Sequence, residues 1–120
     1  MTSKVSSQML KGILSGCILV LLSRETLYGY KISTALMAFG FDEVPMGTIY
    51  PLLLSLEKKG FIQSQLQPSE NGPDRKYYTL TAAGKAEKKA FIKQWQVLST
   101  NVAQLIKEDV YEDLSSDRTK

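Results

Sequence analysis

Two stretches of the chain carry groups that could contact phosphates and base edges. Gly47, Thr48 and Tyr50 stand at the start of an apolar helical pattern, where backbone N–H groups and hydroxyls can approach an anion closely. Arg75 and Lys76 follow a Gly-Pro turn signal and supply the cations that phosphate oxygens prefer. This is the chemistry of polyanion binding. The remaining candidates of the same kind are Lys31 and Lys58.

Several classes of site are excluded by the composition. The chain has no histidine and only one cysteine, Cys17, which lies inside the apolar run "CILVLL". A histidine metal site, a histidine general base and an internal disulfide are therefore impossible. We expect Cys17 to be a small core residue, and we expect no enzymatic activity, no metal and no cofactor.

Charge is unevenly distributed along the 120 residues, a length that suits one modest core. Residues 1–106 hold 12 Lys and Arg against 7 Asp and Glu, a balance of +5, whereas residues 107–120 hold 3 against 5, a balance of −2. A basic body with a slightly acidic tail fits a polyanion-binding domain, although an ordinary solvated surface has a similar composition.

Apolar spacing predicts three helices in the first half, at about 6–23, 28–39 and 45–59. The N-terminal run resembles a signal peptide, but Ser15 and Gly16 interrupt it and Arg24 closes it, so we expect a buried helix. Gly40 and Gly60 are the expected left-handed caps. The expected buried residues are Met9, Leu10, Ile13, Leu14, Cys17, Ile18, Leu21 and Leu22, then Tyr28, Ile32, Ala35, Leu36 and Phe39, then Ile49, Leu52, Leu53 and Leu56.

The second half predicts a hairpin and one long helix. Two alternating segments, 61–67 and 75–81, flank the turn cluster "PSENGPD", and Thr81 can cap a helix from 82 to about 110. At 1.5 Å per residue this helix is roughly 40 Å long, too long for so small a domain to cover. Its apolar residues step by 4, 3, 4 and 3, which predicts packing on a second copy. This seam is Phe91, Trp95, Leu98, Val102 and Leu105.

Together these elements predict a mostly α fold with a small β-hairpin. The order matches a winged helix-turn-helix, in which the third helix enters the DNA major groove. We expect the DNA-binding domain at 1–80, a C-terminal dimerisation helix at 81–112 and a flexible tail at 113–120. The alternative is a winged-helix module that binds protein through its hairpin and third helix. Leu54, expected to be exposed, would then be part of the docking face.

Three blocks of the sequence carry a resemblance to a known family. "LYGYKI", "GTIYPLLLSLEKKGFI" and "NGPDRKYYTLTAAGK", in this order, resemble the PadR family of transcriptional regulators. The resemblance implies a homodimeric winged-helix repressor whose last helix packs with the first helix of its partner. It places residues 47–51 at the start of the recognition helix, and 72–73 with 75–78 in the wing. Many members have a basic pair where this chain has Leu54 and Ser55.

Several of these residues also have a purely structural interpretation. Tyr50 can pack, and Arg75 and Lys76 can be solvated charges. Leu54 can touch a thymine methyl or be an isolated surface leucine. Tyr77 and Tyr78 point to opposite faces of a strand, so at least one should be buried.

The expected partners are double-stranded DNA, with an inverted-repeat operator, and a second copy of the chain. Some relatives in the family stack planar aromatic drugs between paired tryptophans, which makes such an effector at Trp95 one possibility. The other possibility is that Trp95 only fills the interface. We expect a cytoplasmic, ligand-responsive regulator with no contact to the membrane.

Overall fold

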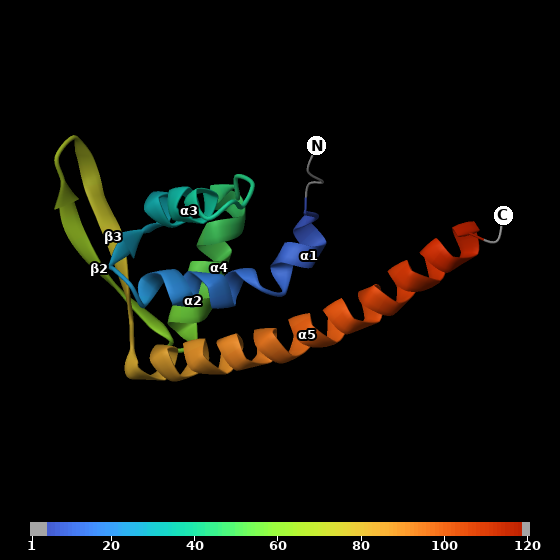
Figure 1. The fold of residues 1–120 in the computed structure, drawn as a ribbon. Coiled ribbons are helices and arrows are strands. Elements are labelled where there is room, and N and C mark those ends of the chain that lie inside the picture. Colours follow the sequence, from blue (N-terminus) through green and yellow to red (C-terminus); the bar gives the residue numbers. More distant parts are fainter. Residues whose placement is uncertain (1–4, 119–120) are drawn as a thin grey trace. The chain divides into compact units, whose positions relative to one another are not determined.

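The computed structural model describes residues 5–118 and confirms the predicted fold class (Figure 1). Within these residues five helices and three strands follow one another. In order they are α1 (Ser7–Lys11), α2 (Leu14–Leu22), β1 (Leu27–Tyr28), α3 (Gly29–Ala38), α4 (Met46–Lys58), β2 (Ile62–Ser69), β3 (Gly72–Leu80) and α5 (Ala82–Arg118).

The chain divides into two compact units between Lys88 and Lys89, inside α5, and the expected division into a DNA-binding domain and a dimerisation helix stays a prediction. The first unit holds helices α1 to α4, the three-stranded sheet and the start of α5. The second is the remainder of α5, which continues past its predicted end at residue 112 to Arg118. The predicted tail therefore begins as helix, and its last residues, 119–120, lie outside the described residues, as do 1–4 of the expected first domain.

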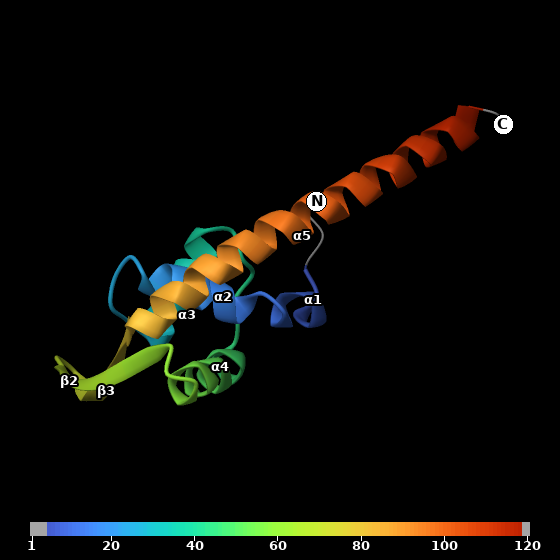
Figure 2. The ribbon, with the colours of Figure 1, turned by 90° about the horizontal axis from the view of Figure 1, so that it is seen from below.

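One core holds the first unit together. In Figures 1 and 2, α4 runs across α2 and α3, and the β2–β3 hairpin lies beside this cluster. Apolar side chains from these helices and from the hairpin form the core, and their burial stabilises the fold by about 25 cal/mol for each Å² of apolar surface removed from water. Cys17 is partly buried against this core, and burial raises the pKa of its thiol, so it is a packing residue as expected. The most deeply buried side chains are Leu14, Ile18, Leu19, Ile32, Leu36, Ile49, Leu53 and Ile62.

The first predicted helix is wrong as a single element. It is interrupted at Gly12 and Ile13, where Ile13 leaves the helical region with φ −120° and ψ −15°. Glycine has the largest backbone freedom to lose in a helix, and here the chain bends at it. Met9, expected to be buried, lies in the separate α1 with 71% of its surface exposed.

The second helix, predicted at about 28–39, is observed as α3 (Gly29–Ala38), one residue shorter at each end. Tyr28 belongs to β1, which sequence patterns did not reveal, and β1 pairs antiparallel with β3 through Leu27–Tyr78 and Tyr28–Tyr77. The sheet order is therefore β1-β3-β2. Phe39 lies just past α3 and is 62% exposed, with the Arg24 guanidinium 5.2 Å from its ring centroid. Its expected place in the core is wrong.

Glycine caps and one threonine fix the joints between elements. Gly40 and Gly60 have φ of 97° and 82° and end their helices as predicted. Thr81 caps α5: its hydroxyl accepts from the Gly84 N–H at 3.0 Å and donates to the Gly60 carbonyl at 2.6 Å. A Cβ at Gly84 would overlap the Phe61 carbonyl oxygen, so the first turn of α5 lies directly on the start of the hairpin.

Candidate nucleic-acid interface

The start of α4 is an uncapped helix N-terminus. The Pro45 carbonyl accepts from the N–H groups of Thr48 at 2.9 Å and Ile49 at 3.1 Å, and no side chain caps this end. Within the described residues, the N–H groups of Met46 and Gly47 have no acceptor. The helix dipole adds partial positive charge at the same place. This end of α4 therefore offers backbone donors to an anion.

Gly47 is not required by the fold of the chain itself. It lies in the helix without a positive φ, it is exposed, and a Cβ built on it meets no atom within 4 Å. Alanine would stabilise an exposed helical position by about 1 kcal/mol relative to glycine. Without a side chain at Gly47, a binding partner can approach the backbone of α4 more closely than it could approach an alanine.

Tyr50 both packs and remains accessible. A Cβ at Gly29, the first residue of α3, would lie 3.1 and 3.3 Å from two carbons of the Tyr50 ring and 3.0 Å from the Met46 terminal methyl. The ring of Tyr50 therefore rests on the α3 backbone, while 53% of the residue is exposed. The N-termini of α3 and α4 meet at this contact, and Lys31 is exposed two residues further along α3.

Arg75 is held beside this meeting point by an aromatic ring. Its guanidinium carbon lies 4.4 Å from the centroid of the Tyr28 ring, and Tyr28 makes an edge contact with Tyr77 at 5.3 Å. Tyr28 immediately precedes Gly29, so the wing cation and the two helix starts are linked through one short segment. Stacking on an aromatic face orients an arginine without neutralising it.

The hairpin presents one cation on each face. Tyr78 is buried, with 4% exposed, whereas Tyr77 is half-buried on the opposite face, as the alternation predicted. Lys76 shares the Tyr78 face and pairs with Leu66 of β2, and Arg75 shares the Tyr77 face. Both cations are exposed.

The second half of α4 is attached to the sheet. The Ser64 hydroxyl donates to the Glu57 carboxylate at 2.7 Å. Burial, together with the nearby Glu57 and Tyr50, raises the pKa of Tyr78, so this buried phenol stays neutral. The Glu57 carboxylate is therefore already hydrogen-bonded to the hairpin. It is the one acidic side chain of α4, so the exposed face of the helix carries no acidic group.

The structure brings together only part of the predicted set. Gly47, Tyr50, Lys31 and Arg75 lie on segments that meet around Tyr28 and Gly29. Lys58 is exposed at the other end of α4, Thr48 is half-buried, and Lys76 is on the other face of the hairpin. Tyr28 and Gly29 were missed as part of the site, because "LYGYK" gives no sign that its tyrosine pairs with a distant strand.

Comparisons with known proteins identify the family. The sequence model of the transcriptional regulator PadR-like family matches residues 18–90. The chain belongs to the PadR-like family of transcriptional regulators. Solved relatives include a PadR-like transcriptional regulator from Bacillus cereus, 47% identical over 83% of this chain and 97% of that one, with a TM-score of 0.74. A Streptococcus transcriptional regulator is 42% identical over 83% and 98%, with a TM-score of 0.73.

Other relatives agree with this assignment. A PadR family regulator from Eggerthella lenta is 31% identical over 82% of this chain and 86% of that one, with a TM-score of 0.74. A Lysinibacillus sphaericus protein of uncharacterized function is 32% identical over 93 residues, 76% of this chain and 85% of its own. The matched family and these solved relatives are transcriptional regulators. Within residues 5–118, no helix is long and apolar enough to span a membrane.

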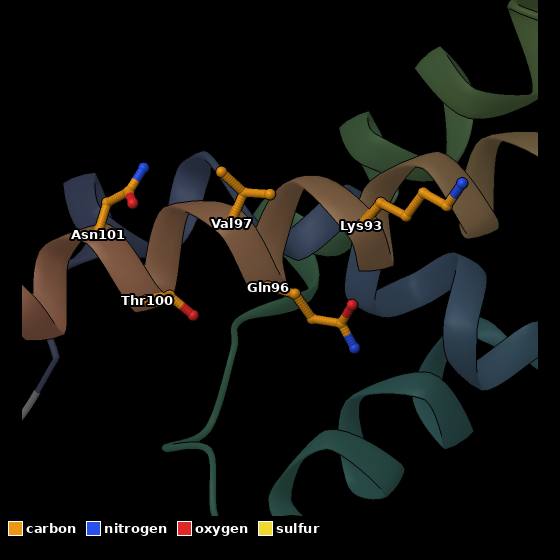
Figure 3. A pocket seen from close by; sticks show the side chains of 5 residues that line it. All are labelled: Lys93, Gln96, Val97, Thr100 and Asn101. Carbon is orange, nitrogen blue, oxygen red and sulfur yellow. The ribbon is translucent and has the colours of Figure 1, made fainter.

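The second unit of this PadR-like chain is a helix with apolar residues on its surface. Of the predicted seam, Trp95, Leu98, Val102 and Leu105 are 44–70% exposed. A shallow hollow of about 440 Å³ lies elsewhere on α5, lined by residues that include Lys93, Val97 and Asn101 (Figure 3). At 3.6 residues per turn these residues lie on a different face of α5 from Trp95, and that side chain does not line the hollow.

Proposed function

We propose that this chain is a cytoplasmic repressor that binds DNA as a homodimer. Each copy places the start of α4 in a major groove, with Lys31, Lys58, Arg75 and Lys76 on flanking phosphates. The observation that carries the proposal is Gly47, a helical glycine whose open position is explained by close approach of a duplex. The uncapped N–H groups beside it and the stacked Arg75 support the same surface.

The proposed dimer sets the form of the DNA site. A dimer formed through the α5 seam about a twofold axis requires an inverted repeat, with half-sites about one helical turn, roughly 34 Å, apart. The exposed apolar residues of the seam support this assembly, since their burial against a second copy removes them from water. The same symmetry gives each operator two copies of every contact.

Gly47→Ala tests the role of α4. We expect a rise in the free energy of unfolding of about 0.5–1 kcal/mol, because alanine is the better helix former. Affinity for an operator duplex should fall about tenfold, since a methyl group now separates the helix from the phosphates. Denaturant unfolding and fluorescence anisotropy with labelled duplex measure the two quantities on the same preparation.

Gly12→Ala is the matched control for this experiment. Gly12 also has a helical φ, −75°, and open space around its Cβ position, but it lies at the end of α1. This variant should keep the DNA affinity of the parent protein. Equal affinity of Gly47→Ala and the parent would remove α4 from the DNA interface.

Trp95 is the proposed contact for a small planar aromatic effector. It is the only tryptophan, it is 46% exposed, and the seam brings it near its symmetry mate in the proposed dimer. Such a ligand would change the separation of the two α4 helices and so shift the equilibrium between dimers that fit the operator and dimers that do not.

Titration with ethidium, in the absence of DNA, tests this site. We expect saturable quenching of the Trp95 fluorescence, and a loss of dye affinity of about tenfold in Trp95→Ala measured by calorimetry. Val97→Ala, in the hollow on another face of α5, is the control and should bind the dye normally. Absence of quenching in the parent protein would count against the effector site.

A further inference from the structure

The exposed ridge of α4 lacks the side chains that usually read bases. From Met46 to Leu56 the helix contains no Arg, Lys, Asn, Gln, Asp or Glu. Bidentate hydrogen bonds to guanine or adenine need the guanidinium, ammonium or amide groups of such residues. The exposed residues of these turns offer hydroxyl groups and apolar surface only. They are Gly47, Tyr50, Pro51, Leu54 and Ser55.

Leu54 occupies the centre of this ridge. It is 68% exposed, whereas its neighbour Leu53 and Leu56 on the buried face are 1% and 3% exposed. Gly47, Leu54 and Lys58 are spaced by seven and four residues, so they form one row along the outward side of the helix. Leu54 therefore lies in line with the open glycine at which the duplex is proposed to approach.

Two further apolar residues lie beside Leu54 on the helix surface. Tyr50 and Pro51 precede it by four and three residues, the spacing at which helical side chains are neighbours. Tyr50 is held in place by its contact with Gly29. Pro51 is exposed, Leu54 is 68% exposed, and Tyr50 keeps 53% of its surface exposed beside its contact with α3.

We propose that Leu54 is a specificity-determining residue that reads the 5-methyl group of thymine in each operator half-site. This inference rests on the proposed DNA-binding function and names the base chemistry that α4 recognises. Thymine is the base that presents an apolar atom at the major-groove edge, so it is the base that an apolar patch can distinguish. Tyr50 and Pro51 enclose the same methyl, and hydroxyl contacts and groove shape supply the remaining selectivity.

Uracil substitution isolates the methyl group. Operator duplexes are selected with the parent protein from a randomised library, and each thymine of the selected site is then replaced by uracil, one base pair at a time. At the position facing Leu54 we expect affinity to fall about fourfold for one half-site and about fifteenfold for both, the value of one buried methyl each. Leu54→Ala should bind the thymine and uracil duplexes equally, whereas Leu54→Met should keep a preference for thymine.

Leu66→Ala is the matched control. Leu66 is also an exposed leucine, at 62%, but it lies on the hairpin, and the thymine methyl is in the major groove. Its loss should leave the methyl effect unchanged. Equal affinities of the parent protein for thymine and uracil duplexes at every position would overturn this inference while leaving DNA binding intact. A methyl effect that persists in Leu54→Ala would overturn the assignment to Leu54. Failure of the parent protein to select or bind any duplex, even at low salt, would instead overturn the proposed function and favour protein docking by this patch.

Discussion

Leu98→Asp is expected to convert the protein from a dimer to a monomer and to lower its operator affinity by about a hundredfold or more. Leu98 lies mid-seam and is 55% exposed in the single chain. A twofold interface would bury two new carboxylates, and each unpaired buried charge costs several kcal/mol. A monomer then loses the gain that comes from binding two linked half-sites. Sedimentation should give the mass of one 13.4 kDa chain, and anisotropy the affinity.

Val97→Asp is the control, since Val97 is 62% exposed and lies about a third of a turn away from the centre of the seam on α5. The variant adds the same charge to the same helix, and it should remain dimeric with unchanged operator affinity. A dimeric Leu98→Asp together with a monomeric Val97→Asp would place the interface on the other face. Dissociation of neither would remove this part of α5 from the dimer contact.

The double variant Arg75→Ala, Lys76→Ala is expected to have the second large effect. If both cations contact phosphates, a dimer loses four such contacts, and the slope of log affinity against log salt should become less steep by about 3.6. Affinity near 0.1 M salt should fall by about a hundredfold or more, for every duplex sequence alike. Anisotropy titrations over a range of salt concentrations measure both quantities.

Lys85→Ala with Lys89→Ala is the matched control for the wing. Both lysines are exposed near the start of α5, and their loss changes the net charge of the protein by the same amount. This variant should keep most of the salt slope. Similar slopes in the two double variants would mean that the wing acts only through overall charge. Arg75 and Lys76 lie on opposite faces of the hairpin. The two single variants, Arg75→Ala and Lys76→Ala, therefore test which face of the hairpin contacts the phosphates.

The sequence predicted those elements whose signals are local. Ile49, Leu53 and Leu56 repeat at helical spacing, and Gly60 ends α4 with the positive φ that only glycine adopts easily. Thr81 sits directly before α5 and caps it. Each of these features is decided by residues within a few positions of one another, so single-sequence patterns describe them well.

One error arose where a distant strand decides the structure, and two arose where a helix breaks or ends before its apolar pattern does. β1 has only two residues, and its conformation depends on pairing with Tyr77 and Tyr78 of β3. Met9 and Phe39 fit the apolar periodicity of their segments, but the break at Gly12 and the end of α3 before Phe39 carry them out of the core.

The candidate site was predicted as a set of residue types and not as an arrangement. Glycine, hydroxyl and basic residues pointed to α4 and the wing as candidate DNA contacts, because the residue types alone show which groups can bind phosphates. The contacts of Tyr28 with Arg75 and of Gly29 with Tyr50 join the start of α3 to the hairpin and to α4. No local sequence pattern predicts these contacts.

The connection between the hairpin and α5 is short and is held by hydrogen bonds. Thr81 binds the carbonyls of Gly60 and Phe61, and Gly84 rests against the same Phe61 carbonyl. The first turn of α5 is therefore attached to the sheet without a flexible linker. Inserting extra residues after Leu80 is expected to break these contacts and to separate the first turn of α5 from the end of α4.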